Sequence, residues 1–176
     1  MLTTEQVTAA RSRVAQMMRD AGLVITPTEI ANIEVTDVGL DRYPTIGLEV
    51  VLYVNTTRVC AKELVLFPNQ GFPEHRHPSV DGEPGKEETF RCRWGKVYLY
   101  VPGEPTPNHY GTPASGREAC YTSWHEIALE PGQQYTMFPD TPHWFQAGPE
   151  GAIVSEFSTR SRDETDIFTD PAVVRV

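Results

Sequence analysis

Two histidines separated by one residue are the strongest chemical signal in the chain. His75 and His77 point to the same face if their segment is an extended strand, so one metal ion can bind both imidazoles. Glu88 and His143 are the next candidate ligands, and His143 follows a proline-containing turn. Three imidazoles and one carboxylate suit Mn²⁺, Fe²⁺, Co²⁺, Ni²⁺ or Zn²⁺, with positions left for water or substrate.

The histidines and the glutamate can also have ordinary roles that do not involve a metal ion. An isolated His-x-His pair is more often a surface pair than a metal site, but three of the chain's five histidines fall in the pattern described. The other two, His109 and His125, lie in loop or edge segments, where a solvated side chain is expected. Glu87 competes with Glu88 for the role of carboxylate ligand.

The composition is that of one globular domain. The 176 residues are 39% hydrophobic and 22% charged. The formal net charge of -9 disfavours binding to nucleic acid or to a membrane surface by bulk electrostatics. No run approaches the roughly 20 apolar residues of a membrane span, and the N-terminus lacks a secretory signal, so a cytoplasmic protein is expected. Cys60, Cys92 and Cys120 have no Cys-x-x-Cys spacing and are predicted to be buried thiols.

The elements that must position these residues fall into two groups. Residues 1–45 form a helical segment, in which apolar residues at helical spacing predict a first helix: Val7, Ala10, Val14, Met17 and Ala21. Thr3 and Gln6 suit a capping box, and Gly22 suits the end of this helix. A second short helix is expected over 27–33, with its proline in the first turn.

Residues 46–176 read as a β-domain. Short runs rich in Val, Ile, Tyr and Phe predict strands at 48–54, 59–67, 89–94, 96–101, 126–129, 135–138 and 152–157. Turns rich in proline and glycine separate them, and the absence of helical patterns between them argues against a parallel fold. We therefore expect a mainly β protein, a sandwich or closed barrel, with the helical segment packed on it. Residues after about 160 are interpreted as a mixed-charge tail.

This arrangement resembles the cupin superfamily, a double-stranded β-helix that forms an antiparallel jelly-roll barrel. The resemblance rests on the His-x-His pair, on Glu88 with Gly95 seven positions later, and on His143 at the start of a late strand. Three segments narrow it to the cupin-type D-lyxose isomerases, over roughly residues 46 to 166: 74–78, 85–90 and 155–163. The chain departs from the general cupin pattern in the ten residues between His77 and Glu88, where three or four are usual.

The resemblance implies a metal-dependent aldose-ketose isomerase of free sugars, converting D-lyxose to D-xylulose and D-mannose to D-fructose. Such a reaction moves a proton between C1 and C2 of the open-chain sugar, and it needs a base and a cation for the enediolate. One divalent ion, with Mn²⁺ expected, would be held by His75, His77, Glu88 and His143. Glu156 is the implied base, although a salt bridge at the barrel rim to Arg160 or Arg162 is the alternative.

Further residues are candidates for contact with the sugar. Lys86 shares a face with Glu88, so its ammonium can neutralise the enediolate. Lys62 lies in an apolar strand, where an unpaired ammonium is costly, and it is either a substrate or carboxylate partner or an edge-strand lysine. The resemblance suggests Asp163 as an acid that assists proton transfer, against a solvated tail. Phe90 and Trp144 are candidate cavity walls, as is Phe138, although core packing is equally consistent.

Three other functions stay open. An isomerase of phosphorylated sugars would need basic residues around the phosphate, and Arg160 and Arg162 keep it possible. An iron-dependent dioxygenase could use the same metal ligands, and a non-catalytic sugar-binding cupin could keep the ligands without a working base. We also expect a homodimer, because jelly-roll domains often bury a strand edge or an N-terminal arm in a partner.

Overall fold

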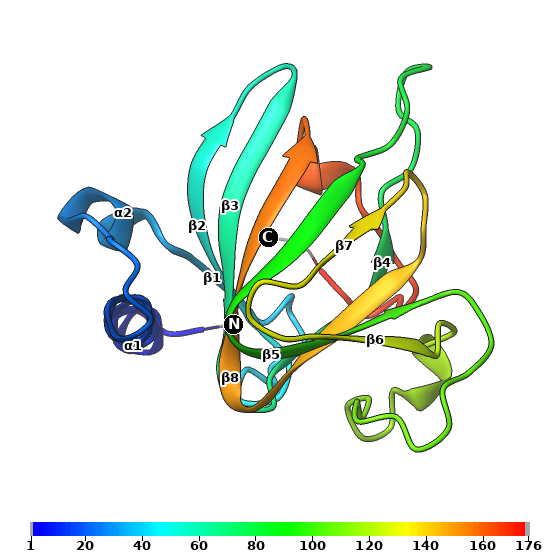
Figure 1. Ribbon diagram of the computed structural model, residues 1–176, viewed down its shortest axis with the longest axis horizontal. Coiled ribbons are helices and arrows are strands. Elements are labelled where there is room, and N and C mark those ends of the chain that lie inside the picture. The colour runs from blue at the N-terminus through cyan, green and yellow to red at the C-terminus, as the bar shows by residue number, and fades with distance from the viewer. Residues whose placement is uncertain (1, 175–176) are drawn as a thin grey trace.

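The strands form an antiparallel barrel with two helices packed on its outside, shown in Figure 1. The computed structural model describes residues 2–174. In chain order the elements are α1 (Thr4–Asp20), α2 (Pro27–Asn32), β1 (Glu34–Thr36), β2 (Leu48–Asn55), β3 (Val59–Leu66), β4 (Gly71–Arg76), β5 (Glu88–Val101), the 3₁₀ turn η1 (Glu118–Cys120), β6 (His125–Leu129), β7 (Gln134–Met137), β8 (His143–Thr159), the 3₁₀ turn η2 (Asp163–Thr165) and β9 (Ile167–Phe168).

Two long bent strands, β5 and β8, close the barrel. The first half of β8 pairs with β4, its second half pairs with β3, and β5 lies beside both halves. The register shifts twice in β5, on either side of Gly95. Gly95 has φ +69°, and a Cβ there would lie 2.1 Å from the carbonyl oxygen of Gly151 on β8. Glycine is therefore needed where the two strands bend together.

This topology confirms the expected jelly-roll barrel and corrects several element boundaries. The runs 89–94 and 96–101 are one strand, and 152–157 is only the second half of β8. The segment after residue 160 is not a solvated tail, because it forms η2 and β9 and buries Ser161 and Asp170. Cys60 and Cys92 are buried as expected, whereas Cys120 is only partly buried.

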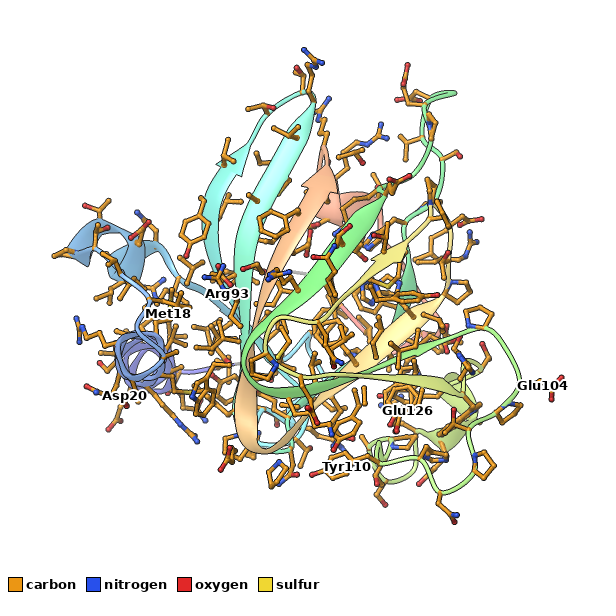
Figure 2. The ribbon with its side chains drawn as sticks, viewed as in Figure 1. Met18, Asp20, Arg93, Glu104, Tyr110 and Glu126 are labelled. Carbon is orange, nitrogen blue, oxygen red and sulfur yellow. The ribbon has the colours of Figure 1, made fainter. Side chains whose placement is uncertain are left out.

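Alternation along the strands sorts the apolar side chains into two cores. Leu64 and Val154 point into the barrel, while Val65 and Ile153 point outward against the helices. Met18 of α1 is fully buried in this outer core, on the side of the helix that faces the sheet in Figure 2.

The N-terminal helices begin at well-formed caps. Thr3 and Gln6 form the expected capping box at the start of α1, and Thr26 and Glu29 form a second one at the start of α2. The short strand β1 that follows α2 pairs with β2, which ties this segment to the sheet. No helix in the range 2–174 has the length and apolar content needed to cross a membrane.

Candidate active site

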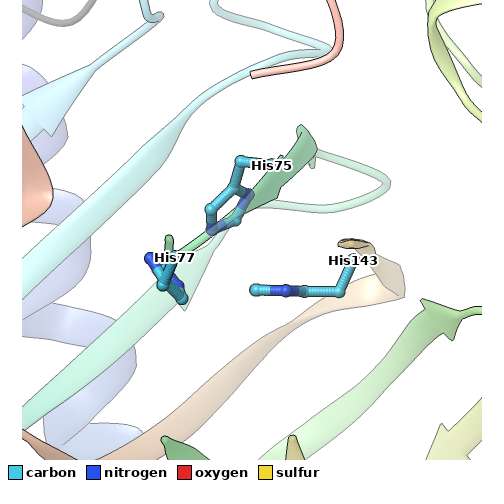
Figure 3. Close-up of side chains that lie close together, drawn as sticks. All are labelled: His75, His77 and His143. Carbon is cyan, nitrogen blue, oxygen red and sulfur yellow. The ribbon is translucent and has the colours of Figure 1, made fainter. Parts of the chain in front are cut away.

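Three histidines converge inside the barrel, as Figure 3 shows. His75 lies on β4, His77 follows that strand, and His143 begins β8. The pairing of β4 with β8 sets His75 directly opposite His143. The candidate ligand atoms of the three imidazoles all lie within 4.8 Å of one another, and all three residues are buried.

Glu88, the first residue of β5, completes the cluster. Its Oε1 lies 2.9 Å from Nε2 of His143 and 3.1 Å from Nε2 of His77. The long loop before it returns close to His77, since a Cβ on Gly85 would lie 1.9 Å from the His77 carbonyl oxygen. Glu87, the competing ligand candidate, is exposed instead.

Hydrogen bonds fix the orientation of all three imidazoles. Nδ1 of His75 lies 3.0 Å from the carbonyl oxygen of Pro73, and Nδ1 of His143 lies 2.9 Å from that of Thr141. Because a carbonyl oxygen only accepts, each Nδ1 carries the proton. Nδ1 of His77 likewise donates to Oδ1 of Asp166 at 2.6 Å. In the neutral rings each Nε2 then presents a lone pair to the centre of the cluster.

This arrangement fits a bound cation. Nε2 of His143 is buried without a hydrogen-bond partner, although a carboxylate oxygen of Glu88 lies beside it. Two electron pairs facing each other repel unless a proton or a metal ion lies between them. Hydrogen bonds from the opposite ring nitrogens to carbonyl and carboxylate oxygens are also the usual outer contacts of metal-bound histidines.

Burial and neighbouring charges shift the pKa values of this cluster in different directions. Burial, together with His143 and His77, holds the pKa of His75 well below its usual value. Burial also lowers the pKa of His77, but Glu88 and Asp166 outweigh it and raise that pKa to about 9. Burial would raise the pKa of Glu88, yet Lys86, His77 and His143 hold it well below its usual range. The carboxylate of Glu88 is therefore ionised and available to a cation.

A second group of charges lies next to the histidines. Lys86 is 2.7 Å from Oε2 of Glu88 and 3.0 Å from Oε1 of Glu156, so it bridges the two carboxylates. Lys62 lies 3.6 Å from the same Oε1 of Glu156. Strand register explains this grouping, because Lys62 on β3 is directly opposite Glu156 on β8, which is directly opposite Phe90 on β5.

These contacts exclude the alternative roles considered for Glu156, a salt bridge at the rim, and for Lys62, a lysine on an edge strand. Glu156 is 3% exposed and pairs with two lysines, not with Arg160 or Arg162 at the rim. Lys62 lies on a strand flanked by β2 and β8 and is 5% exposed, so it is not an edge-strand lysine. Burial lowers the pKa of Lys62, but Glu156 and Asp163 outweigh it and raise that pKa, which keeps the ammonium charged.

The C-terminal segment supplies two acids to this site. Asp163 on η2 contacts Lys62 at 3.3 Å, and Ser161 contacts the same ammonium at 3.1 Å. Asp166, which supports His77, was not among the residues selected from the sequence. Its only sequence signal is its place in the acidic run with Asp163, 89 positions from the histidine that it contacts.

The aromatic candidates lie in different places. Phe90 is buried with its ring edge-on to His143, and it lines the cavity beside the metal ligands. Trp144 follows the inward-facing His143 and so points to the opposite side of the strand, where its ring stacks on Tyr100 at a centroid distance of 3.8 Å. This placement removes Trp144 from the cavity wall. Phe138 is 69% exposed and is not part of the wall either.

The cavity enclosed by these groups carries two unbalanced negative charges when its histidines are neutral, as they are when each Nε2 binds a cation. Four carboxylates then face two ammonium groups. The carboxylates are those of Glu88, Glu156, Asp163 and Asp166, and the ammonium groups those of Lys62 and Lys86. A divalent cation would balance them. The free space is about 30 Å³, enough for about two water molecules, so a sugar needs the lining side chains to move.

Comparison with known proteins identifies close relatives of the whole chain. It is 58% identical to the D-lyxose/D-mannose isomerase of Thermosediminibacter oceani over 176 residues, which are 100% of this chain and 97% of that protein. It is 61% identical to the D-lyxose ketol-isomerase of Cohnella laeviribosi over 167 residues, 95% of this chain and 92% of that protein. No family model matches the sequence.

Solved structures with the same fold are more distant in sequence. An L-ribose isomerase variant of Acinetobacter sp. DL28, in complex with L-ribose, superposes with a TM-score of 0.83 at 16% identity and covers 98% of this chain and 94% of its own. L-ribose isomerase of Cellulomonas parahominis, also with L-ribose, gives 0.81 at 17% identity, with the same coverage. At this identity the similarity concerns the fold.

Proposed function

The chain belongs to the family of D-lyxose ketol-isomerases, which are sugar isomerases, and we propose that it interconverts D-lyxose with D-xylulose and D-mannose with D-fructose in a metal-dependent reaction. The observation that carries this proposal is the buried pairing of Glu156 with two lysines beside the histidine cluster. A dioxygenase or a sugar-binding module has no need of a base held in this way.

The donor set supports one divalent ion, with Mn²⁺ as the expected choice, held by His75, His77, Glu88 and His143. Such a ligand set suits several divalent first-row ions. The order of their affinities is much the same at most protein sites, so the ion that is bound in the cell also depends on which ions are available there. When bound, the ion would polarise the carbonyl group of the open-chain sugar as a Lewis acid.

Glu156 is the proposed base. Its contacts with Lys62, Lys86 and Ser158 all fall on Oε1, which leaves Oε2 for proton transfer. Oε2 would take the proton from C2 of the aldose, while the electrons of the C–H bond form the C1–C2 double bond and those of the carbonyl group move to O1, which gives an enediolate. A proton would then move from the O2 hydroxyl group to O1. Oε2 would return its own proton to C1 as the C2 carbonyl group of the ketose forms. The ammonium of Lys86 would stabilise the negative charge that develops on the sugar oxygens.

The remaining site residues would bind and enclose the sugar. Lys62 and Asp163 offer a donor and an acceptor to hydroxyl groups beyond C2. Phe90 would form an apolar wall against the carbon skeleton. Trp144, placed on the other side of its strand, has no part in this proposal.

Replacement of Glu156 tests the proposal. Glu156→Gln keeps the shape of the side chain and removes the base, so we expect turnover to fall by about 10²- to 10⁴-fold while bound metal stays unchanged. Glu87→Gln is the matched control, because Glu87 is an exposed carboxylate one residue from a proposed ligand. Turnover above half of the unmodified rate in Glu156→Gln, or metal loss that parallels the loss of rate, would contradict the role of Glu156.

Two further expectations accompany this function. A homodimer is supported by exposed apolar residues on the outer face of the sheet, where Val59 of β3 is 53% exposed and Phe157 of β8 is 49% exposed. Light scattering tests it, and a monomer would contradict it. The expected location in the cytoplasm is tested by fractionation of the source cells.

A further inference from the structure

One wall of the cavity beside the histidines does not belong to the sheet. The free space is about 30 Å³, so a sugar enters only if part of the lining moves. Most of the lining residues lie on β2, β3, β4, β5 and β8, where movement would break the pairing of the strands. Asp163 and Asp166 instead belong to residues 160–166, which connect β8 with β9 and lie beside the end of β8 in Figure 1. We call these residues the cover segment.

The other irregular part of the lining is held firmly in place. It is the end of the loop that precedes β5, where a Cβ on Gly85 would lie 1.9 Å from the carbonyl oxygen of His77. Lys86, the next residue, contacts the carboxylates of Glu88 and Glu156 at 2.7 and 3.0 Å. Movement of this loop would leave buried carboxylates without a partner. The cover segment is therefore the wall whose movement is least unfavourable.

The cover segment is attached to the barrel on both sides. Before it, the amide of Thr159 donates to the carbonyl oxygen of Glu87 at 3.0 Å, and after it β9 pairs with β4. Between these attachments, no hydrogen bond joins the backbone of residues 161–166 to the backbone of another segment within residues 2–174. Contacts that involve side chains hold this stretch over the cavity.

Asn55, the last residue of β2, makes two of these contacts with the backbone of Ser161. Its Nδ2 donates to the Ser161 carbonyl oxygen at 3.0 Å, and its Oδ1 accepts from the Ser161 N–H at 3.2 Å. Asn55 is exposed, so water can replace both hydrogen bonds with little net change in free energy. Such a pair of bonds can open and close repeatedly.

Ser161 separates the cavity from a hollow on the outside of the barrel. The hollow has a volume of about 400 Å³, and its lining residues are all polar: Asn55, Thr56, Thr57, Arg160, Ser161 and Glu164. On its inner side, the Ser161 hydroxyl group accepts a hydrogen bond from Lys62 at 3.1 Å, and Lys62 lines the cavity. The contact of Asn55 with Ser161 thus lies at the boundary between solvent and the proposed active site.

We propose that Asn55 is a positioning residue that holds the cover segment closed, and that a sugar reaches the cavity from the hollow when its bonds to Ser161 open. In the closed state Asp163 contacts Lys62 at 3.3 Å, and Asp166 contacts His77 at 2.6 Å. Closure therefore completes the lining around the substrate. The entry of a sugar rests on the proposed isomerase function, whereas the opening of the cover segment does not.

The buried thiol of Cys60 can report the opening. Cys60 is 2% exposed and lies directly opposite Asn55, so the two side chains share a face of the sheet. Lys62, two residues along the strand, shares this face and also contacts Ser161. Cys60 is thus flanked by two side chains that bind Ser161. Cys92 lies in the barrel core, where a reagent reaches it only when the barrel unfolds.

Selective labelling of these two thiols tests the proposal. Cys120→Ser removes the third, partly buried cysteine, and labelling of the Mn²⁺-saturated protein by iodoacetamide is followed by mass spectrometry of its peptides. Asn55→Asp keeps the shape of the side chain but faces the Ser161 carbonyl oxygen with a carboxylate, which cannot donate. Labelling of Cys60 relative to Cys92 should become at least about fivefold faster, the factor for the loss of one hydrogen bond. The added charge disfavours the reactive thiolate, so it cannot itself account for faster labelling.

Asn32→Asp is the matched control. In α2 the Asn32 side chain also donates to a backbone carbonyl oxygen at 3.0 Å, that of Thr28, so the substitution removes the same kind of bond and adds the same charge. It should leave the ratio of Cys60 to Cys92 labelling unchanged. Because unfolding exposes both thiols, this ratio distinguishes release of the cover segment from a general loss of stability. Without either asparagine substitution, D-lyxose should slow the labelling of Cys60, since the closed complex covers the thiol.

Three results would overturn the proposal. They are an unchanged labelling ratio in Asn55→Asp, an equal increase of that ratio in Asn32→Asp, and conversion of D-lyxose by a protein whose Cys60 labelling does not respond to the sugar. If Asn55→Asp accelerates the labelling of Cys60 but D-lyxose is neither bound nor converted, the role of Asn55 stands and the proposed free-sugar reaction fails.

Discussion

At the scale of single residues, the proton on each imidazole determines what the histidine cluster can bind. Backbone carbonyl groups hold the protonated Nδ1 of His75 and His143, and the carboxylate of Asp166 holds that of His77. In the neutral rings, the Nε2 lone pairs of His77 and His143 therefore point toward Glu88, where a cation can bind them. Asp166 also increases the electron density on the ring of His77, which strengthens it as a ligand.

Replacement of Asp166 should weaken metal binding. In Asp166→Asn we expect affinity for Mn²⁺ to fall about 10- to 100-fold, because the amide does not orient and polarise His77 as the carboxylate does. Calorimetric titration of metal-stripped protein measures this. Asp163→Asn, on the same turn but in contact with Lys62, should bind the ion nearly as well as unmodified protein. Equal affinities for all three proteins would contradict the role of Asp166.

The residues of this site differ in how far the sequence can predict them. His75, His77 and Glu88 lie within 14 positions, where spacing and residue type suggest a ligand set. Asp166 could not be selected in this way, because the fold alone brings it to His77. His143 was expected at the start of a strand, as the structure confirms, and alternation along that strand puts Trp144 on the face opposite to the histidine. The cavity-wall role of Trp144 was predicted from its residue type alone, which does not include this alternation.

At the scale of elements, the bends of β5 and β8 bring Glu88, at the start of β5, and Glu156, in the second half of β8, to the cavity that His75 and His77 also line. Both bends occur at glycines with positive φ, Gly95 and Gly151. The sequence suggested two separate strands on either side of Gly95. Glycine is typical both of a strong bend within one strand and of a turn between two strands, so the residue type could not distinguish them. The helices were easier to predict, since their capping boxes are local signals.

Substitution at the bend should be far more destabilising than substitution at an open turn. Gly95→Ala places a Cβ 2.1 Å from a backbone oxygen at φ +69°, and we expect a loss of unfolding free energy above about 2 kcal/mol. Gly132 also has positive φ but has no atom within 4 Å of an added Cβ, so Gly132→Ala should lose about 1 kcal/mol. Urea unfolding measures both, and equal losses would contradict the steric argument.

At the scale of the whole molecule, one buried acid outside the site couples stability to pH. Glu49 on β2 is fully buried and accepts a hydrogen bond from Tyr43. Burial raises its pKa to about 8, although Tyr43 and Arg13 lower it. The folded chain thus holds a proton on Glu49 at pH values where the unfolded chain has lost it.

The stability of the protein should fall between about pH 4.5 and 8 for this reason. Below that range both states are protonated and no penalty exists; within it the unfolded state ionises first, so unfolding free energy falls by about 1.4 kcal/mol per pH unit. Above pH 8 the folded state ionises too and the loss levels off. Glu49→Gln should lack this slope. Unfolding free energies of both proteins across the range test it, and parallel curves would contradict the assignment to Glu49.

The central claim is that a buried metal and the base Glu156 together isomerise a free aldose. The most direct measurement is ketose formation from D-lyxose and from D-mannose by metal-stripped protein, before and after single additions of Mn²⁺, Co²⁺, Ni²⁺, Zn²⁺ or Fe²⁺. We expect no ketose without metal and turnover restored by at least one ion, Mn²⁺ among them. Ketose formation at the full rate by stripped protein, or none with any ion that the protein demonstrably binds, would contradict the claim.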